Sequence, residues 1–154
     1  MTLHFVAGQP GQSAPLLDYL ARRTRLRAEV ALAPLNLRPR HVVALTVLRD
    51  RGASAQQAMA ETLDMDGTNV VGLLNELEAA GLVERRRSPQ DRRRHVVEIT
   101  PDGRERLAEA EAAVAAVEDE VLAALDAEQR QTLYLLLHRA TNGVVRCTEE
   151  SPEH

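Results

Sequence analysis

Six arginines within ten consecutive positions form the strongest local charge in the chain: Arg85, Arg86, Arg87, Arg92, Arg93 and Arg94. A guanidinium group is always charged in proteins, and its planar fork of N–H donors fits phosphate oxygens. The whole chain has a net charge of −4, and all 19 of its basic residues are arginine. The local field of this segment, rather than the net charge, therefore selects its partner. Two interpretations are open, a solvated charged hairpin and a binding site for a polyanion.

The carboxylates and histidines show no catalytic or metal-binding pattern. Residues 102–128 hold nine carboxylates against two arginines. Because no histidine or nucleophile lies at a useful spacing from them, we interpret this acidic segment as a solvated helix face. His41, His95 and His138 lack the spacing of metal ligands. The sequence therefore predicts no catalytic residue, no metal, no cofactor and no enzymatic activity.

The composition favours helices as the elements that position these charges. Ala and Leu supply 45 of the 154 residues and aromatic residues only 2%, a balance that favours helices over strands. The single cysteine, Cys147, excludes an internal disulfide and suggests a reducing compartment. Apolar runs fall short of the ~18 residues that span a bilayer, and no signal peptide is evident. We expect a cytoplasmic protein with no membrane partner.

Apolar periodicity and end signals predict six helices. Pro39 suits the first turn of a helix, and Ser54 with Gln57 has the spacing of a capping box. Thr100 is a candidate cap before Pro101, and Asp126 with Gln129 forms a second candidate capping box. The expected helices cover about residues 15–33, 39–51, 55–62, 66–80, 101–125 and 127–143.

The helix over 66–80, which Asp66 can cap, is the most informative segment. Four apolar residues at i, i+3, i+4 and i+7 form one stripe that should be buried: Val70, Leu73, Leu74 and Leu77. At 100° per residue the opposite face carries Thr68, Gly72, Asn75 and Ala79, flanked by Asn69, Val71 and Glu76. Two β-prone runs follow, Leu82–Arg87 and His95–Ile99, and residues 88–91 between them have the composition of a hairpin loop.

This order of helices followed by a hairpin is that of a winged helix-turn-helix. The run LEAAGLVERR, followed by SPQDRRRHVVEITPDG, resembles the wing region of the MarR (multiple antibiotic resistance regulator) family of bacterial transcription regulators. The resemblance extends from about Pro15 to Gly143. It implies a mainly α fold with a small β-hairpin wing, in which flanking helices at both ends form a dimerisation region.

The resemblance also implies roles for individual residues in binding double-stranded DNA. Asp66–Ala80 would be the recognition helix and Val83–Ile99 the wing. Asp91 would hold the shape of the wing, and Arg93 would enter a minor groove. Arg92 and Arg94 would alternate to the other side of the strand, toward phosphates. With no basic residue in the recognition helix, base reading would rest on polar and small side chains. The expected DNA contacts are Thr68, Asn69, Val71, Gly72, Asn75, Arg85, Arg87, Arg92, Arg93 and Arg94.

We therefore expect a homodimer on an inverted-repeat operator, most simply a repressor relieved by a small aromatic or phenolic effector. The implied organisation is a flexible arm (1–14), dimerisation helices (15–35 and 101–143), a DNA-binding lobe (36–100) and a flexible tail (144–154). By resemblance the effector region would include Arg23, Arg27, Arg38 and His41, which are otherwise ordinary surface and boundary residues. Two alternatives stay open. One is a redox-responsive regulator that uses Cys147, and the other is a winged-helix module that binds protein through its acid-rich recognition helix.

Overall fold

The computed structural model describes residues 11–143, so most of the predicted arm, the predicted tail and Cys147 lie outside it. The predicted fold class is confirmed: the described chain is mainly helical, with one small antiparallel sheet. Between residues 11 and 143, no helix combines the length and the apolar character needed to cross a bilayer. The elements in chain order are α1 (Ala14–Leu32), the 3-10 turn η1 (Ala33–Leu35), α2 (Pro39–Arg51), β1 (Ser54–Ala55), α3 (Gln56–Leu63), α4 (Gly67–Ala79), β2 (Val83–Arg87), β3 (His95–Ile99), α5 (Pro101–Val121) and α6 (Ala127–Ala140).

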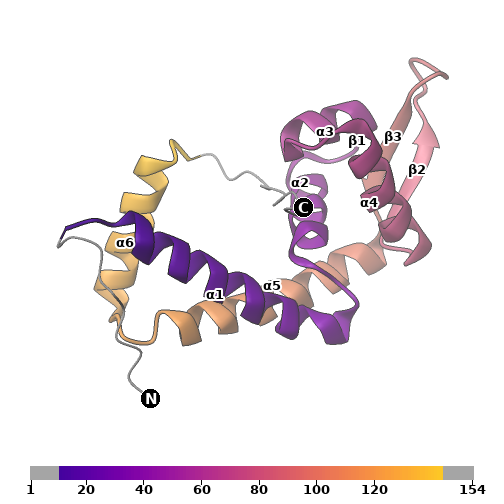
Figure 1. Ribbon diagram of the computed structural model, residues 1–154. Coiled ribbons are helices and arrows are strands. Elements are labelled where there is room, and N and C mark those ends of the chain that lie inside the picture. The colour runs from indigo at the N-terminus through magenta and orange to yellow at the C-terminus, as the bar shows by residue number, and fades with distance from the viewer. Residues whose placement is uncertain (1–10, 144–154) are drawn as a thin grey trace, which may run out of the picture.

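Two long helices connect the two ends of the molecule (Figure 1). α1 and α5 run side by side in opposite directions, and Arg106 of α5 donates to the Leu35 carbonyl oxygen at 2.7 Å. The lobe formed by α2, α3, α4 and the sheet lies at one end, and α6 lies at the other. The core of the lobe includes Leu32 of α1 and Leu107 and Ala110 of α5. The lobe is therefore packed directly onto the long helices.

Local capping signals place three helix starts where the sequence predicts them. Asp66 accepts the Asn69 backbone N–H at 2.8 Å, and Thr100 Oγ1 accepts that of Gly103 at 3.0 Å. Asp126 and Gln129 form the predicted capping box before α6. These caps satisfy backbone N–H groups that the first helical turn leaves unpaired.

The capping box predicted at Ser54 is wrong, because this residue forms a short edge strand instead. Ser54 pairs with Val97 and Ala55 with Val96, so the sheet has three strands in the order β1-β3-β2. The Ser54 hydroxyl donates to the Gly52 carbonyl oxygen at 3.0 Å, and α3 begins after Ala55 without a side-chain cap. A strand of two residues carries no periodic pattern that the sequence could reveal.

The long helix also ends earlier than predicted, at Val121 rather than near Leu125. Residues 122–125 form a turn, in which the Leu125 N–H donates to the Leu122 carbonyl oxygen at 2.9 Å. Asp126 has the extended backbone that an N-cap requires, so the helix cannot continue through it. Apolar residues of the predicted helix recur at steps of three and four, at positions 107, 110, 114, 117, 121 and 124/125, a spacing that predicts an apolar seam. The seam is largely used within the chain, since Leu107, Ala110 and Val117 are buried.

Candidate nucleic-acid interface

Helix α4 buries the predicted stripe and exposes the predicted polar face. Val70, Leu73, Leu74 and Leu77 are all buried in the core of the lobe. The opposite face exposes Thr68, Asn69, Gly72 and Asn75, whereas Val71 is half-buried and packs against the core. The Asn69 side-chain amide donates to the Asp66 carboxylate at 2.9 Å, which ties it to the helix cap. These four exposed residues are small or uncharged and can approach another surface closely, whereas Glu76 and Glu78, which are also exposed on α4, are paired with basic groups.

The wing is a hairpin whose loop is held by hydrogen bonds around Asp91. Strands β2 and β3 pair from Val83↔Ile99 to Arg87↔His95. The Asp91 carboxylate accepts the Arg93 backbone N–H at 3.0 Å, and its carbonyl oxygen accepts the Arg94 N–H at 3.0 Å. The Arg94 carbonyl oxygen in turn accepts the Ser88 N–H at 2.9 Å, which closes the loop.

The predicted alternation of the loop arginines is wrong, because residues 92–94 lie in the loop and not in a strand. The strand β3 begins only at His95. The directions of these side chains are therefore set by the turn around Asp91 rather than by the two-residue period of a strand.

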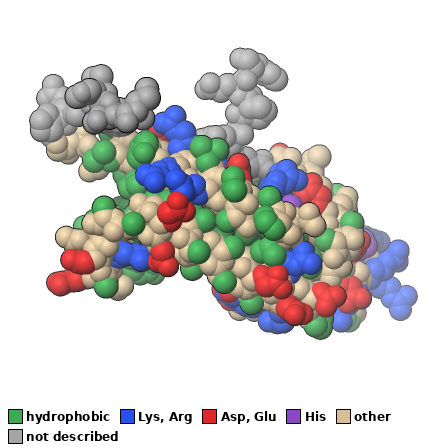
Figure 2. Space-filling model, turned by 90° about the horizontal axis from the view of Figure 1, so that it is seen from below, with side chains coloured by type: hydrophobic (Ala, Val, Ile, Leu, Met, Phe, Trp, Pro, Cys, Tyr) green, Lys and Arg blue, Asp and Glu red, His purple; other side chains and the backbone are tan. Residues whose placement is uncertain are grey.

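The six arginines fall into two groups. Three of them have partners inside the protein. Arg86 pairs with Glu98 at 2.7 Å, Arg94 pairs with Asp91 at 3.6 Å, and Arg85 pairs with Glu78 at 3.3 Å. Within the described part of the chain, the exposed guanidinium groups of Arg87, Arg92 and Arg93 have no hydrogen bond or ion pair. Figure 2 shows basic side chains projecting beyond the body of the molecule on the side where Figure 1 places the wing. These three arginines are the cations available to an external anion.

Arg85 points inward and joins three elements. Its guanidinium donates to Glu78 of α4 at 3.3 Å, to Gln56 of α3 at 3.3 Å and to the Asn75 side-chain oxygen. The Arg85 backbone N–H also donates to Glu78, at 3.2 Å. The Arg85 side chain is only 18% exposed. Sequence reasoning missed Gln56 and Glu78, because no spacing rule connects residues that the fold brings together from different elements.

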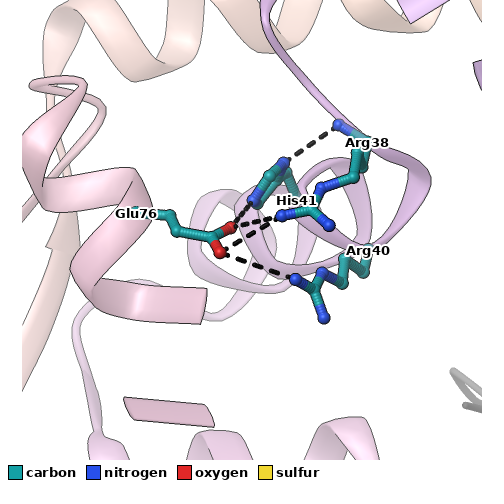
Figure 3. A network of polar contacts seen from close by, with 4 residues as sticks. All are labelled: Arg38, Arg40, His41 and Glu76. Atoms are coloured by element: carbon teal, nitrogen blue, oxygen red, sulfur yellow. Dashed lines mark hydrogen bonds and ion pairs between the residues drawn. The ribbon is translucent and has the colours of Figure 1, made fainter. Parts of the chain in front are cut away.

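A second polar cluster connects α2 with α4 (Figure 3). Glu76 accepts hydrogen bonds from the Arg38 guanidinium at 3.0 and 3.1 Å, and Arg40 lies 3.6 Å from it. His41 is buried, and its Nε2 lies 2.6 Å from Glu76 Oε2. The His41 Nδ1 accepts the Arg38 backbone N–H at 2.9 Å. Glu76 and Glu78, the acidic residues of α4, are thus both neutralised by basic groups of the same chain.

The environment of this cluster shifts two pKa values. Burial lowers the pKa of His41, and this effect outweighs the hydrogen bond and negative charge of Glu76, which act in the opposite direction. The hydrogen bond from His41, together with the charge of Arg38, lowers the pKa of Glu76. At neutral pH the cluster therefore contains an ionised Glu76 and a neutral imidazole.

Comparisons with known proteins show which family this geometry resembles. Residues 35–94 match the model of the MarR family. A Thauera aromatica protein named as a transcriptional regulatory protein for the hcr operon is 38% identical over 95 residues, which are 62% of this chain and 57% of the relative. The HTH-type transcriptional regulator YdgJ of Bacillus subtilis is 33% identical over 100 residues, 65% of this chain and 61% of the relative. The matched stretches thus span less than two thirds of either relative.

A solved MarR-family transcriptional regulator from Rhodococcus sp. RHA1 has 27% identity and a TM-score of 0.72, over 81% of this chain and 89% of that one. The chain is thus similar to MarR-family regulators, with the family match on residues 35–94. Two further structures share this fold. A mutant MarR from E. coli complexed with operator DNA has 22% identity and a TM-score of 0.72, over 83% of this chain and 92% of that one. BpsR of Bordetella bronchiseptica, whose DNA binding is regulated by 6-hydroxynicotinic acid, has 24% identity and a TM-score of 0.74. The alignment covers 88% of this chain and 97% of BpsR.

The four predicted effector residues have two different settings. Arg38 and His41 contact the same carboxylate, that of Glu76. Arg23 and Arg27 line a shallow depression of about 420 Å³ along α1, and Arg27 pairs with Glu120 of α5. In the part of the chain that the structure describes, no group of three or more His, Cys, Asp or Glu side chains is placed to hold a metal ion.

Among residues 11–143, the large exposed apolar side chains are concentrated on the first and last helices. The large exposed apolar side chains are Leu16, Leu17, Tyr19, Leu26 and Val30 of α1 and Tyr134, Leu135, Leu136 and Leu137 of α6. The sequence predicts dimerisation through both terminal helical regions, 15–35 and 101–143. Within the second region, the seam at 107–125 packs largely against the chain itself. Large exposed patches of this kind mark interaction surfaces.

Proposed function

We propose that this chain is a DNA-binding transcription regulator of the MarR family that acts on an inverted-repeat operator. The observation that carries the proposal is the wing, where the side chains of Arg87, Arg92 and Arg93 are exposed and have no partner among residues 11–143. Beside the wing, α4 offers exposed residues that carry no charge. The wing arginines would contact phosphates and a minor groove, while α4 would lie in the major groove. The E. coli MarR structure solved with operator DNA, which has the same fold, supports this arrangement.

We propose a homodimer that is formed by the apolar side chains of α1 and α6. A two-fold axis would present two copies of α4 to half-sites about one helical turn, or roughly 34–36 Å, apart. Sedimentation should give twice the 17.0 kDa mass of the chain. Leu136→Glu adds a charge to the exposed face without touching the core and should yield a folded monomer. A wild-type monomer at micromolar concentration would contradict the dimer.

We further propose that the protein is a repressor released by a small aromatic or phenolic anion. Arg38 and His41 offer a guanidinium and an imidazole, which suit a carboxylate or phenolate. Such an anion would compete with Glu76, and Arg23 and Arg27 on α1 are the other cations proposed for it. Its binding would favour a dimer in which the two α4 helices no longer match the half-site spacing. The regulation of BpsR by 6-hydroxynicotinic acid is consistent with an effector of this chemistry.

The test is selection of bound sequences from a random pool of double-stranded DNA, followed by titrations at several salt concentrations. The pool should yield an inverted repeat. Each neutralised phosphate contributes about −0.9 to the slope of log K against log salt, so two or three arginines per wing predict about −4 to −5 for a dimer. A pool that yields no sequence would overturn the proposal, and so would a slope near zero.

A further inference from the structure

The contact between Arg85 and Asn75 bears on how α4 would read a base, and this inference rests on the proposed function. Arg85 lies on β2 and is mostly buried, whereas Asn75 lies on the exposed face of α4. The Arg85 Nη2 group donates to the Asn75 side-chain oxygen. The same guanidinium is held in place by Glu78 and Gln56. The donor that faces Asn75 is therefore anchored on two other elements of the lobe.

The chemistry of arginine determines which end of the amide faces inward. A guanidinium has five N–H donors and no acceptor, so only the oxygen of the Asn75 amide can face it. A flipped amide would place two donors against each other. The Asn75 side-chain nitrogen is therefore the end that is directed away from Arg85.

We infer that Arg85 makes Asn75 a hydrogen-bond donor toward DNA and thereby selects a guanine at the base pair it meets. Guanine presents two acceptors, N7 and O6, in the major groove, whereas cytosine presents a donor. The usual pairing of asparagine with adenine needs both the amide nitrogen and the amide oxygen on the base. The Asn75 oxygen is directed toward Arg85 rather than toward DNA. An adenine would therefore lose the hydrogen bond that this oxygen would otherwise accept from it. In this scheme Asn75 is the specificity-determining residue and Arg85 is a positioning residue.

The experiment uses the full-length protein and the operator obtained by selection. The position read by Asn75 is the one whose base preference disappears in Asn75→Ala. All four base pairs are then compared at that position for the wild type, Arg85→Met and Asn75→Asp. Arg86→Met is the matched control, because Arg86 lies on the same strand and pairs with Glu98 rather than with Asn75. Thermal unfolding identifies any variant that fails to fold.

The wild type should favour guanine over adenine by about tenfold, a typical value for one well-placed base contact. Arg85→Met frees the amide to turn and should reduce this ratio to about twofold or less. Arg86→Met should leave the ratio unchanged. In Asn75→Asp, one carboxylate oxygen can still accept from Arg85, while the other presents an acceptor to DNA in place of the amide donor. This variant should therefore favour cytosine, which presents a donor.

Three results would overturn the inference. The first is a wild-type preference for adenine at this position. The second is an unchanged ratio in folded Arg85→Met, and the third is an Asn75→Asp variant that still favours guanine. A wild type that selects no sequence at all would overturn the proposed function itself, and the inference with it.

Discussion

His41 of α2 and Glu76 of α4 meet across the boundary between the two helices, with Nε2 of the imidazole 2.6 Å from Oε2 of the carboxylate. The other ring nitrogen, Nδ1, accepts the Arg38 backbone N–H. Because a neutral imidazole has one donor and one acceptor nitrogen, the two contacts specify the tautomer with its proton on Nε2. A second proton on Nδ1 would displace the Arg38 N–H. The pair therefore couples the start of α2 to the position of α4.

Acidification is expected to destabilise the protein in two steps. Burial holds the pKa of His41 below 6.5 in the folded state. As the pH falls below about 6.5, His41 is therefore protonated in the unfolded chain before it is protonated in the folded one. The free energy of unfolding decreases until the pH reaches the folded pKa. The His41 hydrogen bond holds the pKa of Glu76 below 4.5, so its contribution is present above about pH 4.5 and is lost as pH falls through the folded pKa. Urea unfolding from about pH 8 down to about pH 2 covers both steps.

The control for the first step is His41→Asn, whose side chain does not titrate and can still accept the Arg38 N–H. Its stability should be lower than that of the wild type at neutral pH, but it should lose the decrease that begins near pH 6.5. A variant with the same pH profile as the wild type would assign that decrease to another group.

Removal of the Glu76 carboxylate should strengthen the binding of aromatic carboxylates if Arg38 and His41 form the effector site. Salicylate-like compounds should raise the melting temperature of Glu76→Ala more than that of the wild type, because the internal competitor is gone. Glu78→Ala is the matched control, since it removes a carboxylate from the same helix but one that pairs with Arg85. Equal shifts in all three proteins, and in Arg38→Ala, would move the site elsewhere, with Arg23 and Arg27 the next candidates.

Gly103→Ala is expected to destabilise the lobe by about 1–3 kcal/mol, the usual cost of overpacking. A Cβ at this position would collide with the Leu82 carbonyl oxygen and would lie 2.8 Å from Cγ1 of Ile99. Gly72→Ala is the contrasting control, because nothing lies within 4 Å of its Cβ in the middle of α4. It should stabilise the protein by roughly 0.5–1 kcal/mol. Denaturant unfolding of the two variants distinguishes a specific clash from a general effect of losing glycine.

Features decided by nearby residues could be predicted from the sequence. The caps at Asp66, Thr100 and Asp126 each involve a residue three positions later, and the buried stripe of α4 follows from helical spacing. The hairpin was predictable for the same reason, because two β-prone runs flank a short polar loop. The sequence thus predicted the fold class and the elements that carry the proposed DNA contacts.

Features that depend on distant residues could not be predicted. Gln56 and Arg85 are 29 positions apart, and His41 and Glu76 are 35 positions apart, yet each pair is in contact. These contacts decide which arginines are free and how the acidic residues of α4 are neutralised. The edge strand at Ser54 likewise exists only because β3 lies beside it.

The free arginines of the wing should contribute unequally to DNA binding. Arg93 is positioned through the Asp91 carboxylate, which accepts its backbone N–H. If its side chain enters a narrow A·T-rich minor groove, Arg93→Ala should cost on the order of tenfold in affinity, more than Arg92→Ala, and should lower the preference for A·T pairs under the wing. Asp91→Ala should reproduce part of this loss, because it loosens the loop without removing a cation. Arg86→Ala should cost less than Arg93→Ala, since Arg86 is already paired with Glu98.

Asn75→Ala should differ from these wing variants in both base preference and salt dependence. It should relax base preference while leaving the salt slope almost unchanged, because Asn75 carries no charge to exchange with counterions. Operator titrations at several salt concentrations measure affinity, preference and slope together for all five variants. An Arg93→Ala protein that binds as tightly as the wild type at every salt concentration would show that the wing does not supply this contact. The affinity would then have to come from α4, and the largest loss should shift to Asn75→Ala.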